Sequence, residues 1–563
     1  MRFRAVALPA ALAVLVSGCT GSGTAARSDE GTASAEPSPA PVVSDPGARL
    51  TVVADQDPAA QAVSTSRALF ESAPVTVLAR ADDRAGMLLG ASAAVGLGVP
   101  LLVEPAGGGT AELDRELDRL GVDLVLAVGD AEGPDGEGGP EVRAVAADAG
   151  AVAEVTGVEL GESTPVDVDG DAAAVAGLDP EEPVALRADD AAAGAPADGT
   201  ETADADTADA DPLPEVPRHD GLEGTLVLAG DGASPAAVAT ARAAGARVQL
   251  MAGSTDPRAS ADVVEALAGD GVDAVLALGP DLGAEPGLDW KVETAATGAQ
   301  LPGGGQLLFP EHFLVALYGH PGTAALGVLG EQPVDAAIAR AREHAGWYDP
   351  LVADRTVVPA FEIIATIASS SAGADGDYSA EADIEVLRPW VEAAGEAGVY
   401  VVLDLQPGRT DFVTQAELYR PLLELPHVGL ALDPEWRLGP NEVHLTQIGS
   451  VGIDEVNRVV TWLADLTRER RLPQKLLVLH QFRLDMLPGR ERLDTSRDEL
   501  AVLVHADGQG SQGAKQGTWQ ALHQGAPPVW WGWKNFYDED VPMLTPEQTV
   551  EQVQPLPDLI SYQ

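Results

Sequence analysis

An alternation of apolar strand patterns and amphipathic helix patterns runs through residues 311–563 and constrains the fold more than any other feature. Helical segments such as 334–345, 384–398 and 453–470 carry apolar residues three and four positions apart. Strand–helix alternation predicts a parallel sheet, and eight strands over about 250 residues predict a TIM-type (β/α)8 barrel. An open doubly wound sheet is the alternative. The strand candidates are 313–319, 357–366, 399–405, 428–433, 475–480, 500–506, 528–533 and 558–562.

Polar residues stand at the same end of nearly every predicted strand. In such a barrel the carboxyl-terminal strand ends form the active face, and residues two apart in a strand point the same way. A cap or a turn explains one such residue, but not its recurrence on many strands. The predicted catalytic residues are the acids Asp433, Glu435, Asp507 and Asp404. The predicted substrate-binding residues are His320, Glu362, Gln406, His480, Arg483, His505, Trp436, Trp531, Trp533, Lys534, Asn535 and Tyr562.

Carboxyl groups combined with tryptophans are typical of sites that act on sugars. Hydrolysis of a glycosidic bond needs one carboxyl group as an acid and a second as a nucleophile or base. Indole rings offer apolar faces for sugar C–H groups, and WWGWKNFYDED at 530–540 is the expected sugar platform. The acids after strands four and six resemble those of barrel glycosidases at the level of the fold only. We therefore predict a glycosidase-like barrel, with a non-catalytic glycan-binding or structural module as an equal alternative.

Other chemistries are less favoured. The predicted barrel has no Gly-x-Ser-x-Gly elbow and no cysteine thiol for nucleophilic catalysis, and LPGGGQ at 301–306 lacks the lysine of a phosphate loop. We expect no cofactor. A metal-dependent hydrolase or phosphodiesterase-like barrel is a second alternative, but the histidines are scattered and no His-x-His follows strand one, so no metal is predicted. Its ligands would come from His320, Glu362, Asp433, His480, His505 and Asp507.

The first half of the chain repeats one order of strands and helices, which predicts parallel α/β layers. Gly121-Val122-Asp123 returns as Gly271-Val272-Asp273, and Leu78-Ala79 returns as Leu228-Ala229, both 150 residues later. Two matches at one spacing indicate an internal repeat. The first copy contains the segments 75–83, 95–105, 111–121 and 122–130, and the second contains 224–232, 245–253, 261–271 and 272–280.

The motifs VLARADD, PLLVEP and VLAVGD in the first copy resemble the type 2 cell wall binding repeat of Gram-positive surface proteins. The resemblance covers roughly 50–130 and, more faintly, 224–283. It implies a flavodoxin-like repeat that holds proteins to anionic wall polymers. The usual Gly-Gly after the last strand is replaced by Gly129-Asp130 and by Gly279-Pro280, and the formal charge of −54 suits anionic partners poorly. A repeat retained only as a scaffold is therefore the alternative.

The amino terminus has the pattern of an export signal. Arg2 and Arg4 precede an apolar run over 5–16 that is too short to span a bilayer. The run ends in Val-Ser-Gly-Cys19, which is similar to the lipobox of bacterial lipoproteins, and Cys19 is the only cysteine. The resemblance implies cleavage before Cys19 and diacylglycerol on its thiol; an ordinary signal peptide is the alternative. We thus expect a lipoprotein on the outer face of the cytoplasmic membrane, held there by lipid alone.

Composition and boundaries complete the prediction. With 88 acidic and 34 basic residues the chain would repel nucleic acid, so we expect no nucleic-acid partner. We expect a monomer whose partner is wall polymer or another glycan. Since no eighth helix follows the last strand, the linker is expected to cover the seam between strands eight and one, with Tyr562 at the active face. The predicted regions are a signal peptide (1–18), a disordered tether (19–48), the repeat-like α/β region (49–283, with an acidic disordered insertion at about 187–217), a linker packing on the barrel (284–312) and the barrel (313–563).

Overall fold

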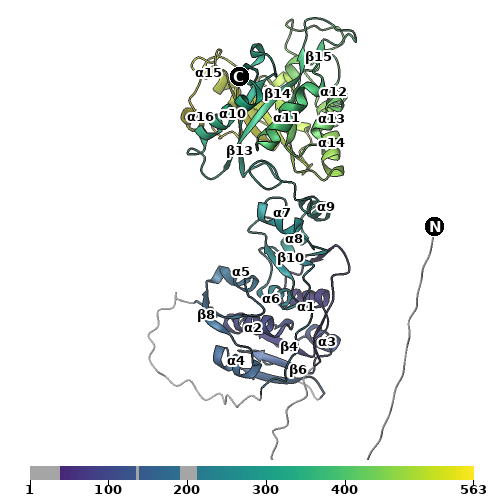
Figure 1. Ribbon diagram of the computed structural model, residues 1–563, viewed down its shortest axis with the longest axis vertical. Coiled ribbons are helices and arrows are strands. Elements are labelled where there is room, and N and C mark those ends of the chain that lie inside the picture. The colour runs from purple at the N-terminus through teal and green to yellow at the C-terminus, as the bar shows by residue number, and fades with distance from the viewer. Residues whose placement is uncertain (1–38, 135–137, 190–211) are drawn as a thin grey trace, which may run out of the picture.

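The computed structural model describes residues 39–134, 138–189 and 212–563 (Figure 1). The predicted signal peptide, Cys19 and much of the tether fall in residues 1–38, and the centre of the acidic insertion falls in 190–211; both stretches lie outside the described residues. Figure 1 shows a first body in purple and blue and a barrel in green and yellow. Among the described helices, none combines the length and apolar character needed to cross a membrane.

The second body is a closed barrel of eight parallel strands, as predicted, and the pairing of its first two strands completes the circle. A short antiparallel strand, β15 (Ser379–Glu381), extends the sheet beyond the second strand. The observed bounds lie within two residues of the predicted ones. The barrel strands are β13 (His312–Gly319), β14 (Thr356–Ala368), β16 (Tyr400–Leu405), β17 (Val428–Leu432), β18 (Lys475–His480), β19 (Leu500–Ala506), β20 (Trp530–Asn535) and β21 (Leu559–Tyr562).

Helices cover the outside of the barrel. In α14 (Ile453–Glu469), the apolar stripe that includes Val456, Val460 and Leu463 is completely buried. Each such side chain contributes about 1.5–3 kcal/mol on burial. Between β18 and β19, two short 3-10 helices (Leu484–Met486 and Arg490–Arg492) replace an α-helix. The other barrel helices are α10 (Val334–Tyr348), α11 (Ile384–Glu396), α12 (Phe412–Leu418), α13 (Arg420–Leu423), α15 (Gln512–His523) and α16 (Pro546–Gln552).

The seam between β21 and β13 is covered by α10 and α16 rather than by residues 284–312. Tyr348 of α10 shares a hydrogen bond with Tyr562 (2.7 Å between hydroxyl oxygens), and its ring lies 5.3 Å from that of Phe313. The segment before β13 instead closes the amino-terminal end of the barrel, where Phe309 lies against Trp530. The expected cover was therefore wrong at the seam, because α10 contacts both strands there and α16 packs on α10.

The first body contains two four-stranded parallel sheets with matching orders, β5-β4-β6-β7 and β11-β10-β12-β2. The central strands β6 and β12 begin and end 150 residues apart, at the spacing of the sequence repeat. The fourth place in the second sheet is taken by β2, which precedes both repeats. The strands are β5 (Leu101–Glu104), β4 (Val75–Arg80), β6 (Leu124–Val128), β7 (Glu141–Val145), β11 (Arg247–Leu250), β10 (Thr225–Ala229), β12 (Ala274–Leu278) and β2 (Leu50–Val53).

The helix α6 (Pro235–Ala243) packs against both α1 (Pro58–Leu69) and α2 (Arg84–Leu97), and the three helices share one hydrophobic core with strands of both sheets. Every α2 residue from Gly86 to Leu97 is buried, which explains why this helix is almost entirely small and apolar. Further helices and two two-stranded sheets complete the body. The helices are α3 (Ala111–Leu120), α4 (Ala149–Thr156), α5 (Asp171–Ala176), α7 (Ala261–Ala268), α8 (Pro280–Gly283) and α9 (Leu288–Ala295). One small sheet pairs β1 (Val42–Val43) with β3 (Phe70–Ser72), and the other pairs β8 (Gly161–Val166) with β9 (Val184–Ala188).

The first body contacts the amino-terminal end of the barrel. Lys291 of α9 forms an ion pair with Asp498, just before β19, at 2.7 Å. The guanidinium of Arg468, near the end of α14, lies 4.6 Å from the ring centre of Trp290. The carboxyl-terminal end of the barrel is consequently directed away from the first body (Figure 1).

Candidate active site at the carboxyl end of the barrel

A ring of polar side chains, here called the polar layer, caps an otherwise apolar barrel interior. Successive side chains in a strand point to opposite faces, so every second residue of each strand faces inward. Closer to the amino-terminal ends of the strands, these inward positions are filled by apolar residues such as Leu314, Ala360 and Val478. At the carboxyl-terminal end, all eight strands instead supply a group that can form hydrogen bonds. The polar layer consists of Tyr318, Glu362, Asp404, Asp433, His480, His505, Lys534 and Ser561.

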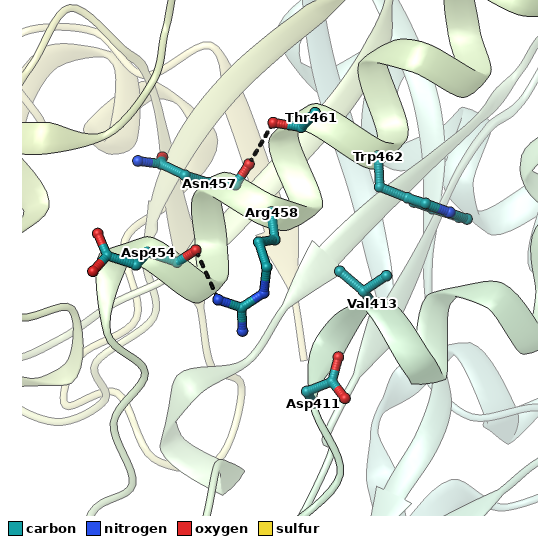
Figure 2. Close-up of a pocket in the computed structure, with 7 residues that line it drawn as sticks. All are labelled: Asp411, Val413, Asp454, Asn457, Arg458, Thr461 and Trp462. Carbon is teal, nitrogen blue, oxygen red and sulfur yellow. Dashed lines mark hydrogen bonds between the residues drawn. The ribbon is translucent and has the colours of Figure 1, made fainter.

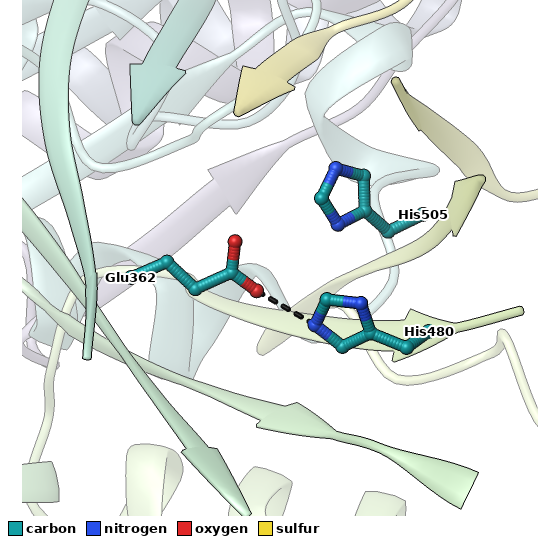
Figure 3. Close-up of side chains that lie close together, drawn as sticks. All are labelled: Glu362, His480 and His505. Atoms are coloured by element: carbon teal, nitrogen blue, oxygen red, sulfur yellow. Dashed lines mark hydrogen bonds and ion pairs between the residues drawn. The ribbon is translucent and has the colours of Figure 1, made fainter. Parts of the chain in front are cut away.

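His480 holds two carboxylates in the ionised state. Its Nε2 lies 2.7 Å from Oε1 of Glu362 (Figure 3), and its Nδ1 lies 3.0 Å from Oδ2 of Asp507. Burial alone would lower the pKa of His480, but the two carboxylates raise it well above its ordinary value. Burial likewise opposes ionisation of the acids, yet the charge of His480 outweighs it, so the pKa of Glu362 falls to about 2 and that of Asp507 is also lowered.

The pKa values of Asp404 and Asp433, the other two acids of the barrel interior, are raised instead of lowered. Burial, opposed by the charge of His480, raises the pKa of Asp404 to about 6, and this carboxylate accepts a 2.8 Å hydrogen bond from the hydroxyl of Tyr318. Burial, together with the charge of Asp404, raises the pKa of Asp433 well above its usual range. Asp433 also caps the 3-10 turn Pro434–Trp436 by accepting from the backbone N–H of Glu435 at 3.1 Å. The buried strand thus ends in a cap that positions the next acid.

Glu435 and Asp507 border the same cavity, which has a volume of about 670 Å³. Burial, and then the charge of Asp507, raise the pKa of Glu435 to about 7. Near neutral pH a substantial fraction of Glu435 therefore keeps its proton while Asp507 is ionised, which is the division of roles that acid–base hydrolysis requires. The aromatic rings of Trp436, Phe482 and Phe536 also border this cavity.

The structure brings many of the predicted site residues to this end of the barrel. The predicted residues that border the cavity are Asp433, Glu435, Asp507, Gln406, Trp436 and Lys534. Asp404, Glu362, His480 and His505 belong to the polar layer, where all four are buried. His320 is half-buried beyond the end of β13, and its Nδ1 lies 2.8 Å from the carbonyl oxygen of Ile364.

The remaining predicted residues lie elsewhere. Arg483 is exposed and pairs with Asp485. In β20, residues 530, 532 and 534 face inward, so Trp531, Trp533 and Asn535 face the helices. Trp531 stacks on His523 with 3.6 Å between ring centres, and the indole N–H of Trp533 donates to Asn535 at 2.9 Å. Tyr562 faces outward for the same reason and contacts α10 rather than the active face. The expected sugar platform is consequently divided, with Lys534 and Phe536 retained at the cavity.

Several residues of the site were not predicted from the sequence. Tyr318 and Ser561 belong to the polar layer, and Phe482 and Lys515 border the cavity. The alternation of inward positions along β13 and β21 would have indicated the first two once the inward parity was known. The ammonium group of Lys534 lies 3.5 Å from the ring centre of Tyr318, so these two groups support each other.

A second hollow, of about 600 Å³, lies on the outside of the barrel between α12 and α14 (Figure 2). Its two acids already have structural partners. Asp411 caps α12 by accepting from the backbone of Thr414, and Asp454 pairs with Arg492 at 2.6 Å. These structural roles do not leave one of the two carboxyl groups to donate a proton and the other to accept one. We therefore place the candidate active site in the barrel. The hollow is bordered by Asp411, Val413, Asp454, Asn457, Arg458, Thr461 and Trp462.

Comparisons with known proteins yield little. Neither protein-family models nor curated proteins match the chain. Among solved structures, the chain is similar to Cwp6 from Clostridium difficile, at 10% identity and a TM-score of 0.29 over 58% of this chain and 64% of that one. It is also similar to Cwp8 from Clostridium difficile, at 15% identity and a TM-score of 0.29 over 45% of this chain and 52% of that one. The match thus spans less than two thirds of either protein, and likenesses of this size carry no argument about fold or function.

Proposed function

We propose that this protein is a cell-surface lipoprotein, associated with the cell wall, whose barrel binds a carbohydrate and hydrolyses a glycosidic bond. The observation that carries the proposal is that two acids border one cavity and that their surroundings shift their pKa values in opposite directions. Glu435, with its pKa raised to about 7, is suited to be the general acid, and Asp507, with its pKa lowered, is suited to be the nucleophile or base.

In the proposed reaction Glu435 gives its proton to the leaving glycosidic oxygen as the bond from that oxygen to the anomeric carbon breaks. Asp507 either forms a bond to the anomeric carbon, and water later hydrolyses the intermediate, or removes a proton from the attacking water. His480 keeps Asp507 ionised through their 3.0 Å hydrogen bond. Asp433 positions Glu435 through its backbone N–H.

The walls of the cavity suit a sugar ring. Trp436, Phe482 and Phe536 offer apolar faces for sugar C–H groups, while Gln406 and Lys534 offer hydrogen bonds to hydroxyl groups. The cavity volume of about 670 Å³ is within the range of small-ligand sites.

The proposed location depends on the first half of the chain. Lipid on Cys19 would hold the protein at the membrane, and the two parallel sheets would contact wall polymer if they act as the repeats they resemble. The cavity lies at the carboxyl-terminal end of the barrel, and the first body lies beyond the opposite end (Figure 1). Wall binding by the first body would therefore leave the cavity free to reach glycan strands.

The test uses the full mature chain and a panel of purified cell wall glycans, with the release of reducing ends as the readout. We expect Glu435→Gln and Asp507→Asn to abolish release, and Asp485→Asn, an exposed acid outside the cavity, to behave as wild type. Glycan that is bound by all these proteins and released by none would identify a binding module instead. If hydrolysis occurs, NMR of the first product will distinguish retention from inversion of the anomeric centre.

A further inference from the structure

Below the cavity, three side chains of the polar layer meet at one point (Figure 3). Glu362, His480 and His505 are all buried, and each offers one ligand atom within 4.8 Å of the other two. The two histidines are distant in sequence, but they are direct register partners in the pairing of β18 with β19. Their ring centres lie 5.0 Å apart.

Atoms that carry lone pairs remain unpaired at this point. Within the part of the chain that the structure describes, Oε2 of Glu362, Nδ1 of His505 and Oδ1 of Asp404 are buried and have no hydrogen-bond partner. Oδ1 of Asp404 lies 3.9 Å from Nε2 of His480, so it belongs to the same group. A buried acceptor without a hydrogen-bond partner destabilises the folded state, and a charged acceptor does so more strongly. Several acceptors without a donor are the arrangement that a cation would satisfy.

The partners of the two histidines also suit a metal site. Nε2 of His505 lies 3.1 Å from the hydroxyl oxygen of Ser561, and donation from this nitrogen would leave the lone pair of Nδ1 directed inward. Nδ1 of His480 lies 3.0 Å from Asp507, which leaves Nε2 facing Glu362. Histidines that bind metals commonly donate their second ring N–H to a carboxylate or another oxygen in this way.

We propose that Glu362, His480 and His505 bind one divalent transition-metal ion beneath the cavity, with Asp404 as a further ligand. Two imidazole nitrogens with a carboxylate favour Zn²⁺ over Mg²⁺ or Ca²⁺, which prefer oxygen ligands. The ion takes the place of the proton between His480 and Glu362, and that proton leaves to solvent. Asp507, which directly follows β19, contacts the site through its 3.0 Å hydrogen bond with Nδ1 of His480.

The test is a calorimetric titration of the full mature chain, first stripped with a chelator, with ZnCl₂ in two buffers of different ionisation enthalpy. We expect one ion per chain, release of about one proton per ion and a higher melting temperature. Co²⁺ bound in place of Zn²⁺ should give visible absorption typical of a low-coordinate site with nitrogen ligands. Ser561→Ala should weaken binding about 10-fold or more by removing the partner of His505, and Glu362→Gln should remove the binding.

A matched control uses a different cluster of possible metal ligands in the described residues. This cluster consists of Asp375, Asp377 and Glu381 and offers oxygen ligands only. Asp375→Asn should leave Zn²⁺ binding unchanged. The proposal is overturned if the wild-type chain binds no Zn²⁺, or if its affinity is the same in Ser561→Ala as in wild type. Loss of binding in Asp375→Asn would also overturn it, because the ion would then lie in the other group. Ser561→Ala and the Co²⁺ spectrum of wild type decide the matter even if Glu362→Gln does not fold.

Discussion

Replacement of Glu435 by glutamine separates its proposed chemical role from its effect on stability. The structure raises the pKa of this carboxyl from 4.5 to about 7. At pH 7 about half of the molecules then carry the proton, against about one in 300 for an unperturbed glutamic acid. If Glu435 is the general acid, wild-type glycan release should decline as pH rises through about 7. Glutamine cannot donate this proton, so release should fall by about 10²–10⁴-fold.

The same substitution has a predictable effect on folding. A carboxyl with a raised pKa in the folded state contributes stability that is present below pH 4.5 and is lost as pH rises through about 7. The pKa shift from 4.5 to about 7 corresponds to about 3 kcal/mol in the free energy of unfolding. Because Glu435 is only partly buried, solvent screening reduces the expected change in stability to about 1–2 kcal/mol. Since glutamine never ionises, the variant should gain stability relative to wild type between pH 5 and pH 8.

Chemical denaturation of both proteins at pH 5, 7 and 8, combined with release of reducing ends, measures both effects. Asp485→Asn is the control and should change neither. Release at the wild-type rate by Glu435→Gln would refute the acid assignment. A stability difference that does not grow with pH would show that Glu435 has an ordinary pKa, and that the electrostatic argument for the site is wrong.

Three further predictions concern other parts of the molecule. His480→Gln should destabilise the barrel by about 3–5 kcal/mol in thermal or chemical unfolding, because it leaves two buried carboxylates without their cation; a change below 1 kcal/mol would contradict the ion-pair arrangement. Trp436→Ala should weaken glycan binding without large loss of stability, whereas Trp531→Ala should lower the melting temperature and spare binding, since only the first ring borders the cavity. Labelling with a clickable fatty acid should mark the wild-type protein and miss Cys19→Ala, and equal label in both would remove the lipid anchor.

The sequence was sufficient to predict the elements of the barrel and the end at which its polar groups gather. Strand bounds such as 475–480 and 500–506 were predicted without error, because each run is short, apolar and bounded by polar or turn residues. Asp433 and Glu435 could be recognised since an apolar run ends abruptly in two acids. The 150-residue spacing in the first half likewise identified the corresponding strands β6 and β12.

The tertiary structure alone decided which side of each strand faces the cavity. Barrel strands are buried on both faces, so their sequences lack the alternation that would mark the inner one. Trp531 and Lys534 are close in sequence, but their side chains lie on opposite faces of β20. Trp531 therefore faces the helices, and Lys534 faces the polar layer. Only the register of β18 with β19 brings His480 beside His505, and only the barrel interior places Glu362 and Asp507 on the same imidazole. The opposite pKa shifts of the acids follow from these distances, because burial and neighbouring charge, rather than residue type, set the direction of each shift.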